Sequence, residues 1–283
     1  RISAPPLAGF ILPALTVVIL LLLYPVTSSI FYSLTNKNLI KPTYRFLGLD
    51  NYIKTLTDPD FWTAFWNDLK WTFFSLLGQL IVGFTGALAL NRIKKGSSIY
   101  RTILIIPWAI PSIVLAFSWK WILNGVYGFL PNLLIKLGLC STAPEFLTGN
   151  LAFATLVFIN IWFGSPLIMV NILSALQTVP KDQYEAAQID GANTFQSFWH
   201  ITVPHIRTVV GLLVVLRTIW IFNSFDIIYL ITGGGPAGST KPLIQYIYET
   251  AFSKNNLGYA AAMSYVLFGI LLVLSLAQLI MQK

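Results

Sequence analysis

The sequence has 283 residues, of which 56% are hydrophobic and 10% charged. A soluble globular chain usually carries about 25% charged residues, so this composition excludes an ordinary water-soluble domain. The formal net charge of +8 does not indicate nucleic acid, because Lys and Arg are scattered among apolar runs rather than gathered on one face. A single cysteine, Cys140, excludes an internal disulfide and a multi-cysteine metal site. We therefore expect the chain to lie in a lipid bilayer.

Six apolar runs are long enough to cross a bilayer, since a spanning helix needs about 20 residues. They cover about 9–34, 69–91, 102–123, 151–176, 205–231 and 259–281. The sequence therefore predicts an all-α, polytopic protein with one transmembrane domain over 1–283, in which a first span precedes core spans at about 69–281. The first run is too long for a signal peptide and is expected to remain. Because the sequence begins at Arg1, we also expect an N-terminal piece ahead of it.

Loop charges predict the orientation. The loop after the second run has only basic charges, which places it in the cytoplasm. These residues are Arg92, Lys94, Lys95 and Arg101. Segment 35–68 balances its charges and fits the outer side, where the aromatic side chains of 61–66 predict an interfacial helix. With six spans, both termini are expected in the cytoplasm.

Prolines and aromatic residues mark the third run. Pro107 and Pro111 predict a kink, because proline lacks a backbone donor and clashes with the preceding turn. Such a kink either opens a cavity or only helps packing. Trp119 and Trp121 predict the outer interface, with Lys120 between them extending to the headgroups.

The loop at 177–204 is cytoplasmic by alternation and predicts a short surface helix. Asp182 is expected to cap this helix, with Glu185 three residues later as in a capping box. Gly191 is expected to end it in the left-handed conformation. Pro204 suits the first turn of the following span.

The same loop contains a spaced motif. It reads Glu185, Ala186, Ala187, three residues, Gly191, nine residues, then Ile201, Thr202, Val203 and Pro204. This pattern resembles the EAA hallmark of the inner-membrane permeases of binding-protein-dependent ABC importers, with Val203 in place of the usual leucine. The resemblance implies a type I permease core of the MetI/MalF-like kind. It also implies that Glu185-Ala186-Ala187, Gly191, Ile201 and Pro204 couple the chain to an ATPase subunit.

A second stretch narrows the branch of the family. Asn223 to Pro236, which ends in Thr-Gly-Gly-Gly-Pro, is similar to the carbohydrate importers of the maltose and glycerol-phosphate type, and to their first permease. This resemblance implies a subunit of a prokaryotic cell (inner) membrane that moves an oligosaccharide, disaccharide or polyol. The implied partners are a second homologous permease, two ATPase subunits and an extracytoplasmic solute-binding protein.

We expect no catalytic activity from this chain. The sequence lacks a G-x-x-x-x-G-K-[ST] phosphate loop, so ATP and Mg are expected on the separate ATPase subunits, with no cofactor on this chain. His200 and His205 lie beside the coupling loop, and no nucleophile–base set or metal motif accompanies them. We therefore expect a transport subunit and not an enzyme.

Polar residues inside the apolar runs are candidates for the solute path, because a polar side chain facing lipid is costly. Trp220, Asn223 and Asp226 are three apart and predict one ridge of the fifth span. The full set of candidates is Asn223, Asp226, Trp220, Arg217, Ser224, Asn160 and Trp162. For Arg217 the alternatives are a structural ion pair or a tie to backbone carbonyls of the partner subunit, and for Asn160 a tie between helices.

Two other functions stay open on the sequence. A self-sufficient secondary transporter should show an inverted repeat and intramembrane carboxylates, for which Asp226 alone is thin support. A permease for a sugar phosphate such as glycerol phosphate should have more cations in its cavity than Arg217. Neutral saccharides or polyols are therefore preferred.

Overall fold

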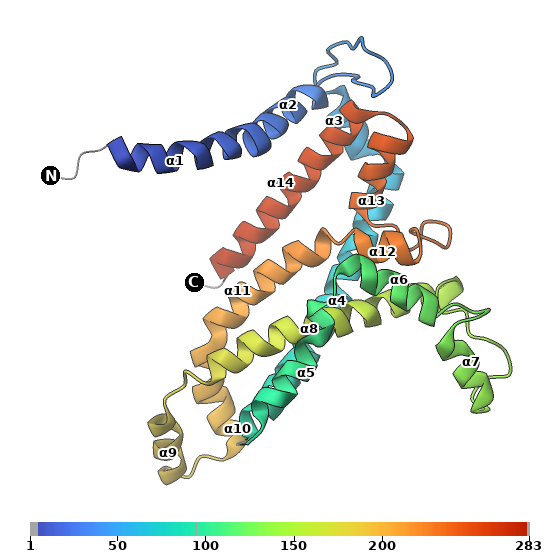
Figure 1. Cartoon of the computed structure of the whole chain (residues 1–283). Coiled ribbons are helices and arrows are strands. Elements are labelled where there is room, and N and C mark those ends of the chain that lie inside the picture. The colour runs from blue at the N-terminus through green and yellow to red at the C-terminus, as the bar shows by residue number, and fades with distance from the viewer. Residues whose placement is uncertain (1–4, 94, 282–283) are drawn as a thin grey trace. The chain divides into compact units, whose positions relative to one another are not determined.

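The computed structural model describes residues 5–93 and 95–281, so Lys94 and both chain ends lie outside the described residues. These residues form helices and one isolated β-bridge, between Thr35 and Phe46 (Figure 1). Among the described residues, five helices are long and apolar enough to span a membrane, or six when one bent pair counts as a span. The prediction of an all-α protein with about six spans is confirmed.

The chain divides into two compact units, 1–63 with 243–273 and 64–242 with 274–283. The first contains α1 (Pro5–Val18), η1 (Ile19–Leu23), α2 (Tyr24–Ser33), α3 (Asp50–Thr57), the start of α4 (Pro59–Arg92), α13 (Leu243–Tyr248), η4 (Glu249–Ser253) and most of α14 (Leu257–Met281). The second contains the rest of α4, α5 (Ser97–Ala109), α6 (Ser112–Ile122), α7 (Phe129–Lys136), η2 (Gly149–Leu151), α8 (Ala152–Leu176), α9 (Lys181–Ile189), α10 (Thr194–Ser197), η3 (Phe198–Thr202), α11 (Val203–Phe222) and α12 (Asp226–Ile231).

Helix α4 is longer than the predicted second span. It has 34 residues, which makes it about 51 Å long against a hydrocarbon core of about 30 Å. The helix begins directly after Asp58, whose Oδ1 accepts a hydrogen bond from the Asp60 backbone N–H at 2.9 Å. No breaker follows, so the aromatic residues of 61–66 lie in the first turns of α4. The aromatic residues are helical, as predicted, and they belong to the helix that continues into the second span, which was predicted to begin near 69.

The carboxylate of Asp58 joins three elements of the first unit. Its Oδ2 accepts hydrogen bonds from the hydroxyls of Tyr246 at 2.8 Å and Tyr259 at 2.6 Å, which ties the start of α4 to α13 and α14. Burial raises the pKa of the Asp58 carboxyl, but the hydrogen bonds from Tyr259, Tyr246 and two backbone N–H groups outweigh it. The pKa of Asp58 therefore lies below its ordinary value.

We expect Asp58→Asn to lower the midpoint of thermal unfolding of the purified protein. A shift of about 2–4 °C corresponds to 1 kcal/mol in a chain of this size, and partial exposure of the carboxyl keeps the loss near that range. Because folding depresses this pKa, the stabilisation is present above the unfolded value of 3.8 and is lost as pH falls through the folded pKa. Asp60→Asn, at an exposed neighbour, is the control. Equal midpoints for Asp58→Asn and wild type at neutral pH would contradict the role of this carboxylate.

In the second unit the third span is broken. Helices α5 and α6 meet at an angle of 89° across Ile110 and Pro111. Ile110 is extended, with ψ of 131°, because a residue before proline is pushed out of the helical region. The predicted kink is confirmed, and it is sharp enough to divide the span into two helices. Helix α6 then packs beside α12 (Figure 1).

The fifth span, Thr194–Ile231, is interrupted near one end. It was predicted as one helix over 205–231, but α11 ends at Phe222 and α12 begins at Asp226. The side chain of Asn223 donates a hydrogen bond to the Ile219 carbonyl at 2.8 Å, and its backbone leaves the helical region with ψ of 15°. A polar side chain that bonds to the last turn competes with continuation of the helix. The predicted single ridge through Trp220, Asn223 and Asp226 is therefore wrong.

Candidate functional site

The helix of the loop at 177–204 ends as expected and begins differently. Helix α9 begins at Lys181 after Pro180, and no side chain caps it. Asp182 is thus the second residue of the helix, and the prediction that it caps α9 is wrong. Its negative charge still interacts favourably with the positive end of the helix dipole. The observed capping box belongs to the next helix, α10, between Asn193 and Gln196.

Gly191 ends α9 in the left-handed conformation, with φ of 79°, as predicted. Its backbone N–H donates to the Gln188 carbonyl at 3.1 Å, and the next N–H, of Ala192, reaches the Ala187 carbonyl at 2.8 Å. After the turn the chain continues through α10 and η3 into α11 (Figure 1). Pro204 lies in the first turn of α11, as predicted.

One side of the EAA segment is exposed, and the other side packs against the spans. Glu185 and Ala186 are exposed, whereas Ala187 is half-buried. Ile201 packs on the core cluster of the second unit, as does Tyr184, whose hydroxyl lies 2.7 Å from the Thr202 hydroxyl. The segment is therefore fixed to the spans on one side and free to meet another molecule on the other.

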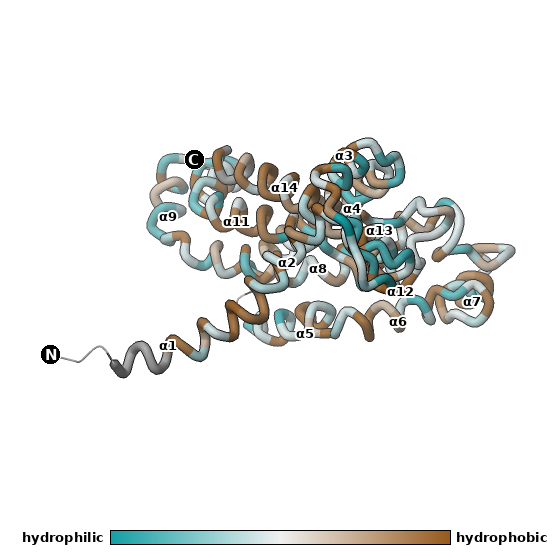
Figure 2. The backbone as a smooth tube through the Cα atoms, turned by 90° about the horizontal axis from the view of Figure 1, so that it is seen from above, coloured by the Kyte–Doolittle hydropathy of each residue, from teal (hydrophilic) through white to brown (hydrophobic). Residues whose placement is uncertain are grey.

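A small hollow and three exposed apolar side chains complete the tip formed by α9 and α10. The hollow, of about 300 Å³, is lined by Ala187, Asp190, Gly191, Ala192, Gln196, Ser197, His200 and Ile201. Ile189, Phe195 and Trp199 are 87%, 71% and 51% exposed. Figure 2 shows α9 as mainly hydrophilic, so these apolar groups stand out at this end. The spacing motif gave no signal for them, and exposed apolar groups of this kind mark interaction surfaces.

The two breaks in the spans meet at a polar contact. Ser112, the first residue of α6, donates a hydrogen bond to Asp226 Oδ2, in the first turn of α12, at 2.7 Å. Asn223 is exposed and Ser224 is half-buried, beside the same break. Trp220 is 54% exposed on the last turns of α11. Ser112 could not be selected from the sequence, because its partner is 114 residues away.

Arg217 and Asn160 are brought together elsewhere, by Gln79. The Gln79 Oε1 atom accepts hydrogen bonds from Arg217 Nε at 3.0 Å and Nη2 at 2.6 Å. Its Nε2 donates to the Asn160 backbone carbonyl at 2.9 Å and to Asn160 Oδ1 at 2.5 Å. The three side chains are 0%, 5% and 3% exposed for Gln79, Arg217 and Asn160. Arg217 is thus tied to an uncharged amide, and Gln79 is a residue that the sequence reading missed.

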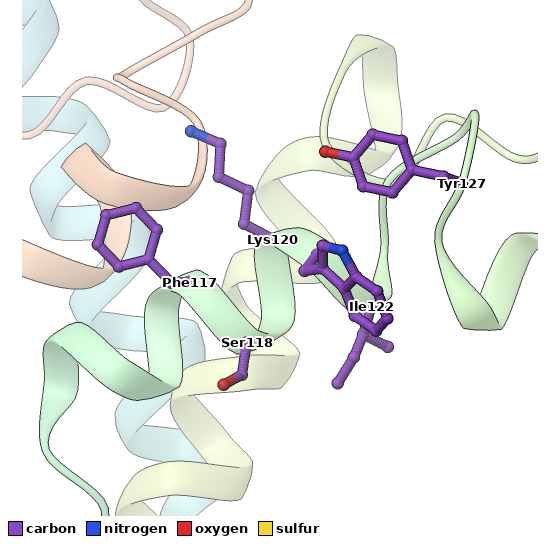
Figure 3. Close-up of a pocket in the computed structure, with 6 residues that line it drawn as sticks. Phe117, Ser118, Lys120, Ile122 and Tyr127 are labelled. Carbon is purple, nitrogen blue, oxygen red and sulfur yellow. The ribbon is translucent and has the colours of Figure 1, made fainter.

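Trp162, the remaining candidate for the solute path, contacts α6. The rings of Trp162 and Trp119 meet edge to face, with centroids 5.5 Å apart. The Lys120 Nζ, which was predicted to extend to the headgroups, donates to the Leu230 carbonyl on α12 at 3.0 Å (Figure 3). A pocket of about 720 Å³ opens beside it. Its lining is Phe117, Ser118, Lys120, Trp121, Ile122 and Tyr127.

Comparison with known proteins assigns the family. Residues 79–283 match the model of the binding-protein-dependent transport system inner membrane component. The chain is 37% identical over 266 residues to the trehalose/maltose transport system permease protein MalF of Thermococcus litoralis, covering 94% of this chain and 88% of that one. It is 34% identical to the sulfoquinovosyl glycerol transport system permease protein SmoG of Agrobacterium fabrum, covering 91% and 84%.

A solved structure shares the fold. A chain of the bacterial alginate ABC transporter, in complex with an alginate pentasaccharide-bound periplasmic protein, superposes with a TM-score of 0.84 at 23% identity, covering 96% of this chain and 92% of that one. The chain is accordingly a multi-pass membrane transport subunit of an ABC importer and not an enzyme. It belongs to the family of binding-protein-dependent transport system inner membrane components.

Proposed function

We propose that this chain is one permease subunit of an ATP-driven importer that takes a neutral oligosaccharide, disaccharide or polyol from an extracytoplasmic binding protein into the cytoplasm. The observation that carries the proposal is the segment 181–204, a short helix with an outward-facing Glu185 and Ala186, ended by a left-handed Gly191 and fixed between two spans. The names of the relatives MalF and SmoG support a sugar-like solute.

In this proposal the tip of α9 and α10 docks on an ATPase subunit. Glu185 offers a charge, Ala186 permits close approach, and the exposed Ile189 and Phe195 offer apolar contacts. ATP and Mg bind to two such ATPase subunits. A second, homologous permease completes the membrane part, and both termini of this chain lie in the cytoplasm, because the basic loop that contains Arg92 and Arg101 faces that side.

The solute path in this proposal passes the broken helices. Asn223, Ser224 and Asp226 offer hydrogen-bonding groups to sugar hydroxyls, and the exposed ring of Trp220 offers an apolar face for stacking. Arg217 and Asn160 lie behind them as supports, since both are buried and bonded to Gln79. Because the guanidinium of Arg217 is already engaged, a neutral solute is favoured over a sugar phosphate.

The test is a tagged pull-down of this chain from detergent-solubilised membranes, with mass spectrometry of what co-purifies in stoichiometric amount. We expect a second permease and an ATPase. A chain that purifies alone and still transports in proteoliposomes would contradict the proposal and favour a self-sufficient transporter.

A further inference from the structure

The buried contact among Gln79, Arg217 and Asn160, which we call the clasp, joins α4, α8 and α11 at one point. One neutral glutamine serves both partners, accepting from the guanidinium and donating to the asparagine. Such a buried polar contact fixes the relative position of its helices, because a slip of any helix leaves buried polar groups without partners.

The surface of α8 is shaped to hold the clasp. Gly164 lies one turn beyond Asn160, and a Cβ atom there would come within 2.2 Å of Gln79 Nε2 and 2.3 Å of Arg217 Nη2. Two glycines of α4 lie equally close to α8: a Cβ at Gly78 would meet Ile161 Cδ1 at 2.1 Å, and one at Gly83 would meet Ile168 Cγ2 at 2.7 Å. Small residues at these positions permit the close helix approach that polar ties in membranes need.

On the cytoplasmic side of the clasp, residues 181–204, which we call the coupling segment, pack against the same three helices. They share one buried cluster, which includes Ala87 and Leu90 of α4, Ile172 and Leu176 of α8, and Ile206 and Leu213 of α11. Tyr184 of α9 and Ile201 of η3 pack against this cluster. A displacement of α9 by a partner therefore acts first on the cytoplasmic ends of α4, α8 and α11.

On the other side, α11 leads from the clasp to the break. Asn223 follows Arg217 by six residues, or about 9 Å along a helix. Beyond the break, Asp226 holds Ser112 at 2.7 Å, and α12 packs beside α6. The clasp thus lies between the segment that would meet the ATPase and the broken helices on the solute path.

We propose that Gln79 and Arg217 are positioning residues for transport: the clasp makes α4, α8 and α11 move as one body, so that displacement of the coupling segment reaches the helix breaks. This inference rests on the proposed coupling role of 181–204. The neutral Gln79 suits the role, because it fixes Arg217 without placing a second charge in the membrane.

The test uses two cysteine reporters in the full complex, in a Cys140→Ser background. Gln188→Cys reports on the exposed face of α9, and Ser118→Cys reports on the exposed outer part of α6. The rate of labelling by a water-soluble maleimide is measured with and without ATP and vanadate. With the clasp intact, we expect both rates to change by about threefold or more, the scale of coupling between linked sites.

The clasp is removed by the double substitution Gln79→Leu and Arg217→Met, which deletes the guanidinium together with the amide that binds it and leaves no buried charge unpaired. We expect the Gln188→Cys reporter to respond as before and the Ser118→Cys reporter to respond no longer. Thr85→Val is the matched control, because the Thr85 hydroxyl bonds only to carbonyls of its own helix, Ile81 at 2.8 Å and Val82 at 3.0 Å.

Three outcomes overturn the inference: an outer reporter that ignores ATP and vanadate while the clasp is intact, one that responds equally without it, or a parallel loss of both responses in the double variant. A Gln188→Cys reporter that fails to respond in the otherwise unchanged complex instead counts against the coupling segment itself, and so against the proposed function.

Discussion

Gly191→Pro is expected to uncouple ATP hydrolysis from solute uptake, lowering the amount of solute moved per ATP by about tenfold or more, as for a coupling of 1–3 kcal/mol. Gly191 has φ of 79°, whereas proline is fixed near −65°. Proline also lacks the N–H that Gly191 donates to the Gln188 carbonyl at 3.1 Å. The tip must therefore refold, while the spans are unaffected. Uptake and ATPase activity of the reconstituted complex, measured in parallel, give the ratio.

Gly191→Ala separates backbone conformation from side-chain clash. No atom lies within 4 Å of a Cβ at Gly191, so alanine meets only the left-handed strain of about 1–2 kcal/mol. We expect an effect between those of glycine and proline. Gly96, in the basic loop after the second span, has the same φ of 79° and equally open surroundings, so Gly96→Ala applies the same strain away from the segment.

Glu185→Lys tests the same segment through charge. Glu185 is exposed, so the substitution leaves the fold unchanged and reverses the charge offered to a partner. Membrane insertion should be normal in every variant of the series. Normal solute-stimulated ATPase activity in both Glu185→Lys and Gly191→Pro would exclude a coupling role for 181–204.

The spans themselves were predictable because a bilayer imposes a length and a composition that a single sequence reveals. Helix α8, for example, covers Ala152–Leu176 against a predicted 151–176. The left-handed Gly191 was predictable for a similar reason, since glycine is the usual residue at that position after a helix. In both cases the cause is local.

The two helix breaks could be predicted only in part from the local sequence. Pro111 predicts the break between α5 and α6. The segment between Arg217 and Ile231 contains no proline or glycine, so the end of α11 at Phe222 could not be predicted in the same way. That break depends on Asn223 bonding to the preceding turn, and α12 continues beside α6. Packing of this kind joins segments more than 100 residues apart and leaves no pattern in one sequence.

The clasp could not be predicted from the sequence for the same reason. Gln79 is visible as a lone amide in an apolar run, but its partner Arg217 is 138 residues away. Arg217 was considered for an ion pair, and the structure instead gives it an uncharged acceptor. A bundle core accommodates one buried cation in this way when the acceptor is itself held, here by the donation of Gln79 to Asn160.

Asp226→Asn is expected to raise the solute concentration for half-maximal uptake by about tenfold, because a hydrogen bond to a charged acceptor contributes about 1.5–3 kcal/mol and 1.4 kcal/mol is a factor of ten. Asparagine keeps an oxygen that can accept from the Ser112 hydroxyl, so the tie between α6 and α12 persists while the charge is lost. Uptake by the reconstituted complex, measured with maltose as the first probe and with other labelled saccharides and polyols, gives the concentration dependence.

Ser112→Ala removes the other half of that contact and is the matched control. If Asp226 meets the solute, loss of the 2.7 Å bond from Ser112 frees the carboxylate without deleting it, and the half-maximal concentration should change by less than about threefold. If Asp226 only holds α12 against α6, Ser112→Ala should be at least as damaging as Asp226→Asn, because asparagine still accepts that bond and alanine cannot donate one. The order of the two variants therefore decides between a solute ligand and a helix tie, and an effect of Ser112→Ala equal to or above that of Asp226→Asn removes Asp226 from the solute path.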